Sequence, residues 1–173
     1  MPARSARRRP STSSRQQATA ALKVRKSRIH GRGVFAAKRF RKGERIIEYT
    51  GRRVSWASIP DHLADGRIYY FGVGDGSVVI DPSVGGNEAR WINHSCAPNC
   101  DIRETRSQRI FIHALRTIQP GEELFYDYRL ELDEDVERTK EVEQECPCHC
   151  GAPNCRGTLL APQSKKEKLK AKK

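Results

Sequence analysis

The cysteines are the side chains of this sequence best suited to binding a metal. Four fall within CPCHCGAPNC and two within NHSCAPNC, namely Cys146, Cys148, Cys150, Cys155, Cys96 and Cys100. Disulfides are the alternative, but they are rare in reducing compartments, and Cys-x-Cys neighbours are poorly placed to pair with each other. A tetrahedral zinc site needs four converging thiolates, which a cluster and a distant pair can supply. The spacing favours zinc and does not choose four ligands from six.

The segment RIHGRGVFA has the residue types of a small anion site. Gly31 and Gly33 would let backbone amides approach a ligand, while Arg32 or His30 would meet a carboxylate such as the methionine end of a cofactor. A plain turn between two strands is the alternative, and it is the commoner meaning of such glycines.

The segment WINHSC is open to two interpretations as well. Asn93 could close a turn and His94 could be a hydrogen-bonded core histidine. Polar residues that follow a Trp-Ile pair are nevertheless costly to bury unless something hydrogen-bonds them. A purine ring is one partner that would do so.

Aromatic residues gather in three segments and could line a binding channel. They are Tyr49, Tyr69, Tyr70, Phe71, Phe125, Tyr126 and Tyr128. Any one of them is more simply explained as core, because aromatic residues favour strands. Alternation along FYDY would place Tyr126 and Tyr128 on one strand face, where two buried hydroxyls need partners.

Short strands joined by tight turns must position these residues. The β-branched or aromatic runs lie at 34–37, 45–51, 68–73, 77–81, 109–115 and 123–128, and Gly, Pro, Asp or Asn bound each of them. Helical patterns are weak and reach only short turns near 55–65 and 87–92. The acidic stretch 131–145 reads as a linker or short solvated helix. A mainly β domain is predicted.

The positive charge lies mostly at the two ends of the chain. Residues 1–28 hold nine Lys and Arg and no acid, and residues 164–173 hold six Lys and one Glu; because the whole chain carries +12, residues 29–163 carry a net −2. The arms have little apolar surface to bury and are predicted to be disordered. Non-specific nucleic-acid contact is assigned to these arms, with solubilising tails or a nuclear address as alternatives.

The sequence predicts no contact with a membrane. No stretch approaches the ~18 apolar residues of a membrane span, and the N-terminus lacks the apolar core of a secretory signal. An intracellular protein is expected, in a nucleus or in a bacterial nucleoid or cytoplasm, with non-classical export as a secreted effector left open.

Taken together, these segments resemble the SET-domain family of protein-lysine methyltransferases with a Cys-rich post-SET segment. HGRGVFA, IIEYTG, GNEARWINHSCAPNC, GEELFYDY and CxCxxxxC occur in the family's order, from about Lys26 to Leu160. The pre-SET zinc cluster of some relatives is absent. The resemblance implies a β-clip of small sheets with a pseudoknot, in which INHSC threads under the loop around ELFYDY, followed by the short zinc-binding segment.

The resemblance also implies roles for individual residues. S-adenosylmethionine would be contacted by His30, Arg32, Gly33, Tyr69, Asn93, His94 and His149. Zinc would be held by Cys96, Cys148, Cys150 and Cys155. Tyr128 would lie nearest the transferred methyl, with Tyr49, Tyr69 and Phe71 as channel walls. Tyr126 stands where relatives carry Tyr or Phe, and the resemblance implies monomethylation with some dimethylation.

The predicted activity is methyl transfer to a lysine of a histone or histone-like basic protein, favoured by the acidic run 131–145. A ribosomal or other non-histone substrate, automethylation of the arms, and a non-catalytic chromatin or nucleoid-binding module are the alternatives. The predicted organisation is a basic arm (1–22), a SET domain (23–131), an acidic linker (132–145), a post-SET zinc segment (146–161) and a Lys-rich tail (162–173).

Overall fold

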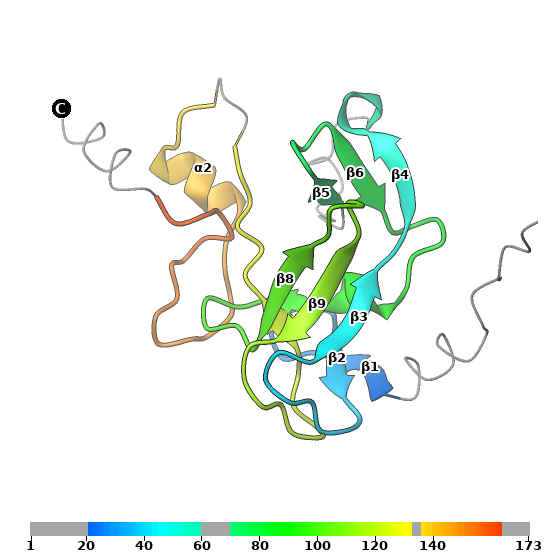
Figure 1. Ribbon diagram of the computed structural model, residues 1–173. Coiled ribbons are helices and arrows are strands. Elements are labelled where there is room, and N and C mark those ends of the chain that lie inside the picture. Colours follow the sequence, from blue (N-terminus) through cyan, green and yellow to red (C-terminus); the bar gives the residue numbers. More distant parts are fainter. Residues whose placement is uncertain (1–20, 60–69, 133–135, 164–173) are drawn as a thin grey trace, which may run out of the picture.

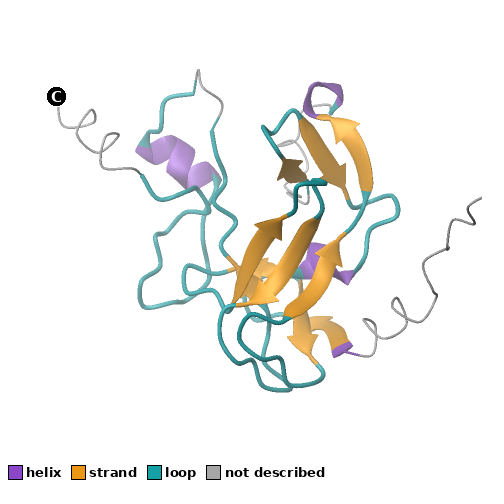
Figure 2. Cartoon of the chain, viewed as in Figure 1, coloured by secondary structure: helices purple, strands orange, loops and turns teal. Residues whose placement is uncertain are grey.

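Small sheets joined by turns make up most of the described chain. The computed structural model describes residues 21–59, 70–132 and 136–163. Within these ranges there are two three-stranded and two two-stranded sheets, with only short helical segments between them (Figures 1 and 2). No described helix is long and apolar enough to cross a membrane. The prediction of a mainly β fold is confirmed.

The elements follow one another in this order: β1 (Leu22–Lys26), β2 (Arg32–Ala36), β3 (Arg45–Tyr49), β4 (Arg52–Ser55), η1 (Trp56–Ser58), β5 (Phe71–Val73), β6 (Val78–Asp81), η2 (Glu88–Trp91), β7 (Asn93–His94), β8 (Cys100–Glu104), β9 (Ile110–Ala114), β10 (Phe125–Tyr126) and α2 (Lys140–Glu145). The sheets have the strand orders β1-β2, β3-β9-β8, β4-β6-β5 and β10-β7. Figure 1 shows α2 and the C-terminal segment on the opposite side of the molecule from β1 and β2.

The hydrophobic core lies against the β3-β9-β8 sheet. Its largest fully buried side chains include Phe40, Ile92, Ile112, Ile118 and Leu124. Successive residues of a strand face opposite sides, so Phe111 points away from Ile110 and Ile112. The guanidinium groups of Arg45 and Arg109 cover its ring at 4.8 and 4.9 Å from the centroid. This cover explains why β9 is apolar on both faces.

Two segments that are distant in the sequence meet in the parallel pair β7 and β10. Asn93 lies opposite Phe125 and His94 opposite Tyr126. Asn99 reinforces the contact, since its side chain donates to Glu123 O at 2.7 Å and accepts from Phe125 N at 2.8 Å. A parallel pair requires a long connection, so only the tertiary fold can create this contact. The predicted proximity of INHSC and ELFYDY is present.

Six predicted strand segments each overlap a described strand, and four further described strands were not predicted. The unpredicted strands are β1, β4, β7 and β8, whose sequences are LKVRK, RRVS, NH and CDIRE. Their charged residues hide the apolar alternation, and pairing with more apolar neighbours stabilises them. The short turn predicted near 87–92 is η2. Of the turn predicted near 55–65, residues 60–65 lie outside the described residues.

Two predictions need correction. The strand predicted over 123–128 contains only Phe125 and Tyr126, so Tyr128 is not on a strand with Tyr126. The basic charge of residues 1–28 is not confined to an arm, because Lys23, Arg25 and Lys26 belong to β1, which pairs with β2 over five residues. Part of the N-terminal charge is therefore a property of the folded sheet.

Candidate functional site: an aromatic cluster beside a cysteine cluster

Four aromatic rings from three parts of the chain form one continuous cluster. The ring centroids of Tyr49 and Phe71 are 5.1 Å apart, those of Phe71 and Tyr126 are 6.3 Å apart, and those of Tyr126 and Tyr128 are 4.9 Å apart. These are ordinary spacings for packed aromatic rings. Tyr49 comes from the end of β3, Phe71 from the start of β5 and Tyr126 from the end of β10. The predicted proximity of Tyr126 and Tyr128 holds without a shared strand.

The hydroxyl of Tyr128 is fixed by the backbone. It donates a hydrogen bond to Ile92 O at 2.9 Å. A carbonyl oxygen can only accept, so the phenol keeps its proton in this arrangement. Tyr128 is thereby suited to orienting a neighbouring group through its oxygen rather than to abstracting a proton.

Tyr126 is a buried phenol within the cluster. It is 8% exposed, and burial raises its pKa well above 10, with a further increase from the neighbouring Tyr128 and Tyr49. A phenol with such a pKa is neutral at physiological pH. The cluster therefore presents neutral hydroxyls and apolar ring surface.

His94 connects the aromatic cluster to the cysteines. Its Nδ1 accepts a hydrogen bond from Tyr128 N at 3.0 Å, and its Nε2 lies 3.4 Å from Cys96 Sγ. An amide N–H can only donate, so a neutral ring carries its proton on Nε2, facing the sulfur. Burial lowers the pKa of His94, although the nearby Asp127 opposes this. His94 was predicted as a cofactor contact, and no sequence pattern indicated that its ring joins the two clusters.

Four of the six cysteines converge on one point. The sulfur atoms of Cys96, Cys148, Cys150 and Cys155 all lie within 4.8 Å of one another, and those of Cys96 and Cys148 are 3.8 Å apart. A tetrahedral metal with bonds of about 2.3 Å to sulfur separates its ligands by about 3.8 Å. Cys100 and Cys146 do not belong to this group. The cluster has the donor set and size of a metal site.

The backbone around the cluster is arranged to receive negative sulfur. Cys96 N donates to Cys150 Sγ at 3.5 Å, Arg156 N to Cys96 Sγ at 3.4 Å and Gly157 N to Cys155 Sγ at 3.4 Å. Burial raises the pKa of Cys150, but hydrogen bonds from the backbone of Cys96 and Ala152 and from neighbouring thiols outweigh it and lower the pKa to about 6. Metal ligands must be thiolates, so the environment of Cys150 favours binding, whereas burial raises the pKa of Cys96 and of Cys148 and opposes it there.

Glu123 and Asn93 organise the glycine-containing turn. Asn93 Nδ2 donates to Arg32 O at 2.9 Å, His30 O at 3.3 Å and Glu123 Oε1 at 3.1 Å. The Glu123 carboxylate fills the space where a Cβ on Gly33 would stand. A methyl group on Gly33 would therefore displace the Glu123 carboxylate, whereas Gly31 adopts a positive φ of 45°.

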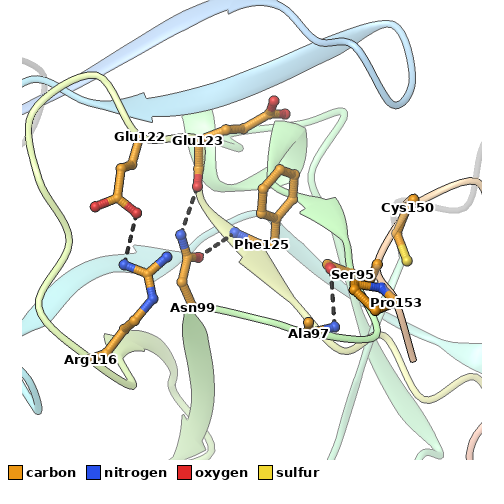
Figure 3. A pocket seen from close by; sticks show the side chains of 11 residues that line it. Ser95, Ala97, Asn99, Arg116, Glu122, Glu123, Phe125, Cys150 and Pro153 are labelled. Carbon is orange, nitrogen blue, oxygen red and sulfur yellow. Dashed lines mark hydrogen bonds and ion pairs between the residues drawn. The ribbon is translucent and has the colours of Figure 1, made fainter. Parts of the chain in front are cut away.

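A pocket of about 330 Å³ opens beside this network. Figure 3 shows it between the loop that carries Ser95 and Asn99, the segment Glu122 to Phe125, and the C-terminal segment near Cys150 and Pro153. Its walls combine an aromatic ring, a carboxamide, carboxylates and Arg116, which pairs with Glu122 at 2.7 Å. The pocket is an open hollow, and its volume is at the lower end of the ~300 to 1,000 Å³ range of small-molecule sites.

The other predicted cofactor contacts are more dispersed. Arg32 is exposed and its guanidinium lies 5.1 Å from the ring centroid of Trp91. His30 and His149 are both exposed. His30 precedes β2, and His149 lies between Cys148 and Cys150 of the cluster. Tyr69 lies outside the described residues.

Several residues near the site were not singled out by the sequence. Glu123 and Asn99 hold the crossing segments, and Asp127 pairs with Arg156 between the two clusters. Phe125, by contrast, was among the aromatic residues that the sequence analysis named, and it lines the pocket. In the sequence, these polar residues are distinguished only by lying next to a recognised motif. Many surface residues do so as well, so this position alone could not have identified them.

A model of the SET domain matches residues 31–129. The H3 lysine-4 specific histone-lysine N-methyltransferase of Schizosaccharomyces pombe is 40% identical over 159 residues, covering 80% of this chain and 16% of that protein. Histone-lysine N-methyltransferase 2B of Homo sapiens is 38% identical over 151 residues, covering 80% of this chain and 5% of that protein. The chain thus spans less than a fifth of the length of these relatives.

Solved structures are similar over most of the described fold. KRYPTONITE in complex with mCHH DNA, an H3(1-15) peptide and SAH matches with a TM-score of 0.64 and 32% identity, covering 80% of this chain and 29% of that chain. A humanized mutant of the Chaetomium thermophilum Polycomb Repressive Complex 2 bound to the inhibitor GSK126 matches with a TM-score of 0.53 and 31% identity, covering 62% of this chain and 15% of that chain.

Proposed function

The chain belongs to the SET-domain family, and from this membership we propose that it is a protein-lysine N-methyltransferase. It would transfer a methyl group from S-adenosylmethionine to a lysine of a histone or histone-like basic protein. The observation that carries the proposal is the aromatic cluster of Tyr49, Phe71, Tyr126 and Tyr128 beside the β7-β10 crossing. Relatives named as histone-lysine methyltransferases support the substrate class.

The cluster suits a lysine that has to lose its proton. A free lysine has a pKa near ~10.4 and is a cation at pH 7, which cannot act as a nucleophile. Apolar ring surface disfavours the ammonium form and lowers that pKa. When bound, S-adenosylmethionine would supply an electrophilic methyl group. The rings would hold the neutral amine in line with it, and Tyr128, whose proton is engaged by Ile92 O, would orient the reacting groups.

The cofactor would bind where the glycine turn, the β7-β10 crossing and the C-terminal segment meet. We assign contacts to the residues that the family motifs indicate: His30, Arg32, Gly33, Tyr69, Asn93, His94 and His149. The pocket beside Phe125 and Asn99 offers an aromatic face and a polar edge for the adenine. KRYPTONITE was solved with SAH, the demethylated form of this cofactor, which supports the assignment.

The four-cysteine cluster would hold zinc. Four thiolate ligands are typical of structural zinc sites and leave no open position for catalysis. The 3.8 Å separation of the Cys96 and Cys148 sulfurs fits a tetrahedral edge. The metal would add to the contacts that already join the segment after Cys146 to the domain, which are the Leu130–Leu160 bridge, the Arg156–Asp127 pair and the hydrogen bond from Asn154 Nδ2 to Cys96 O.

The extent of methylation would be limited by Tyr126. Its buried, neutral hydroxyl narrows the cluster and can hold a water against the amine. A methylated amine must rotate to accept a second methyl, and this crowding hinders the rotation. Monomethylation, with some dimethylation, is the proposed outcome.

A basic substrate would be drawn by acidic residues near the C-terminal segment. Glu141 and Glu145 are exposed on α2. Neutralising both as glutamines is expected to raise KM for a basic peptide several-fold with kcat retained, because rim charges act mainly on encounter. Asp101→Asn on β8 is the control. An unchanged KM would remove these acids from substrate binding. Since the named relatives act on histones, the proposal places the chain with chromatin.

Contact with nucleic acid is a second candidate function. The exposed cations Lys23, Arg25, Lys26 and Arg28 on and after β1 favour it. Binding by such cations should weaken steeply as salt rises and should not depend on sequence. Replacing the four by glutamine would reduce the salt dependence of DNA binding if the folded sheet contributes, and would leave it unchanged if it does not.

Methyl transfer with radiolabelled S-adenosylmethionine tests the proposed activity. The expected result is label on a histone among candidate basic proteins, and a loss of about hundredfold in kcat for Tyr128→Phe, because a small displacement of reacting groups costs about this much. The variant should still bind S-adenosylhomocysteine. Absence of both transfer and cofactor binding in the wild-type protein would refute the proposal.

A further inference from the structure

Asp127 lies between the two tyrosines of the proposed channel and is held by an arginine from the cysteine segment. Arg156 donates from both terminal nitrogens, to Asp127 Oδ2 at 2.9 Å and to Oδ1 at 2.7 Å. The two side chains are only 20% and 22% exposed. A two-pronged pair of this kind has a defined geometry that a single ammonium contact lacks.

Arg156 is also part of the wall of the cysteine cluster. It follows Cys155 directly, and its backbone nitrogen donates to Cys96 Sγ at 3.4 Å. Among the described residues, its buried Nε has no hydrogen-bond partner. Leaving a buried donor unpaired costs free energy. The side chain is thus held in place by its two bonds to Asp127 and not by a fully satisfied environment.

A second connection runs parallel to this one. Tyr128 N donates to His94 Nδ1, and His94 Nε2 faces Cys96 Sγ. The Tyr126 to Tyr128 segment is therefore tied to the cysteine cluster twice, through the Asp127 side chain and through Tyr128 N, and the two ties meet at His94, whose Nδ1 lies 3.5 Å from Asp127 Oδ1. No described strand or helix contains Asp127 or Tyr128, so these side-chain contacts take the place of regular structure.

We infer that Arg156 is a positioning residue that joins the cysteine cluster to the tyrosines of the proposed lysine channel through its pair with Asp127. The inference rests on the proposed methyltransferase function for its kinetic consequence only. Formation of the cysteine cluster fixes the position of Arg156, and Arg156 in turn fixes the Asp127 side chain. Asp127 then fixes the backbone between Tyr126 and Tyr128. The metal site would thus control the geometry of a reaction in which it takes no chemical part.

The alternative is that Arg156 merely offsets the charge of the sulfurs. Four thiolates and one divalent zinc carry a net charge of −2, and a nearby cation is favourable whatever its shape. Arg156→Lys separates the two explanations, because it keeps the positive charge and removes the guanidinium group that forms two hydrogen bonds to Asp127. Asp127→Asn is the complementary change, since it leaves Arg156 in place and removes the carboxylate.

The matched control is Arg109→Lys. Arg109, which directly precedes β9, also forms a two-pronged pair, with Glu48 on β3, and lies beside the sheet rather than at the site. Hydrogen–deuterium exchange of residues 124–130 is the direct measurement and needs no activity. The melting temperature, the amount of bound zinc, and kcat and KM for a basic peptide are measured on the same variants.

Arg156→Lys and Asp127→Asn are expected to speed exchange at residues 124–130 and to lower kcat by about tenfold to hundredfold, with zinc stoichiometry and peptide KM nearly unchanged. The double variant should be little worse than either single one. Arg109→Lys should change neither quantity. Unchanged exchange in Arg156→Lys, or loss of zinc from it, would overturn the inference. If the wild-type chain methylates nothing, the proposed function fails, while exchange still decides the positioning role.

Discussion

Glu123 occupies the space beside Gly33 that any larger residue would need. Its carboxylate accepts a hydrogen bond from Asn93 Nδ2 at 3.1 Å, and Asn93 in turn donates to the backbone of the glycine turn. One carboxylate therefore connects the turn before β2 with both strands of the β7-β10 pair. The proposed cofactor contacts depend on this packing, because it fixes the turn and the crossing relative to each other.

Gly33→Ala is expected to disrupt this arrangement. The new methyl group collides with Glu123, and relieving such a collision typically costs about 1 to 3 kcal/mol. We expect a lower free energy of unfolding in denaturant and weaker S-adenosylhomocysteine binding by calorimetry. Gly72→Ala on β5 is the control, since its methyl group meets no atom within 4 Å. Equal stability of the two variants would contradict the role of Glu123.

Tyr126→Phe is expected to raise the number of methyl groups added. The change removes a buried hydroxyl beside Tyr128 while the ring continues to pack against it. With more room for the amine to turn, dimethylated and trimethylated products should increase at least several-fold, as measured by mass spectrometry of a peptide product. A product distribution identical to wild type would show that Tyr126 does not set the limit.

Tyr126 should also give the protein a distinct response to alkaline pH. Because burial raises its folded pKa above the unfolded value near ~10, its contribution to the free energy of unfolding is complete below pH ~10 and is lost as pH rises toward the folded pKa. Relative to Tyr126→Phe, the wild type should therefore lose stability above that pH. Denaturant unfolding of both proteins across this range measures the difference, and parallel curves would contradict it.

Removal of one cysteine should distinguish the cluster from the remaining thiols. Cys148→Ala removes a buried ligand and is expected to lower zinc affinity by more than about hundredfold, which exceeds the effect of changing a residue that only hydrogen-bonds a ligand. Faster hydrogen exchange across residues 146–163 should accompany the loss. Cys146→Ala, which lies outside the cluster, should retain one zinc per chain. Zinc retention by Cys148→Ala would rule out the four-cysteine site.

Local features of the sequence were enough to predict the apolar strands and the kinds of side chain that form the candidate site. The six strand segments rich in Val, Ile and aromatic residues were predicted because alternation and bounding turns are properties of neighbouring residues. The charged strands β1, β4 and β8 were missed because pairing partners distant in sequence stabilise them. The predicted length of β10 was too great for a similar reason. The strand ends at Tyr126, and Tyr128 N then donates a hydrogen bond to His94, which is distant in the sequence.

By itself, the sequence determined the residue types available for metal binding and for an aromatic channel, and the order in which their motifs occur. Cysteine spacing could not select four ligands from six, because the fourth ligand arrives through folding. Only the tertiary structure brought Cys96 to the C-terminal cysteines and placed Arg156 against Asp127. Side-chain geometry across long sequence separations arises from packing of the whole domain, and no local pattern encodes it.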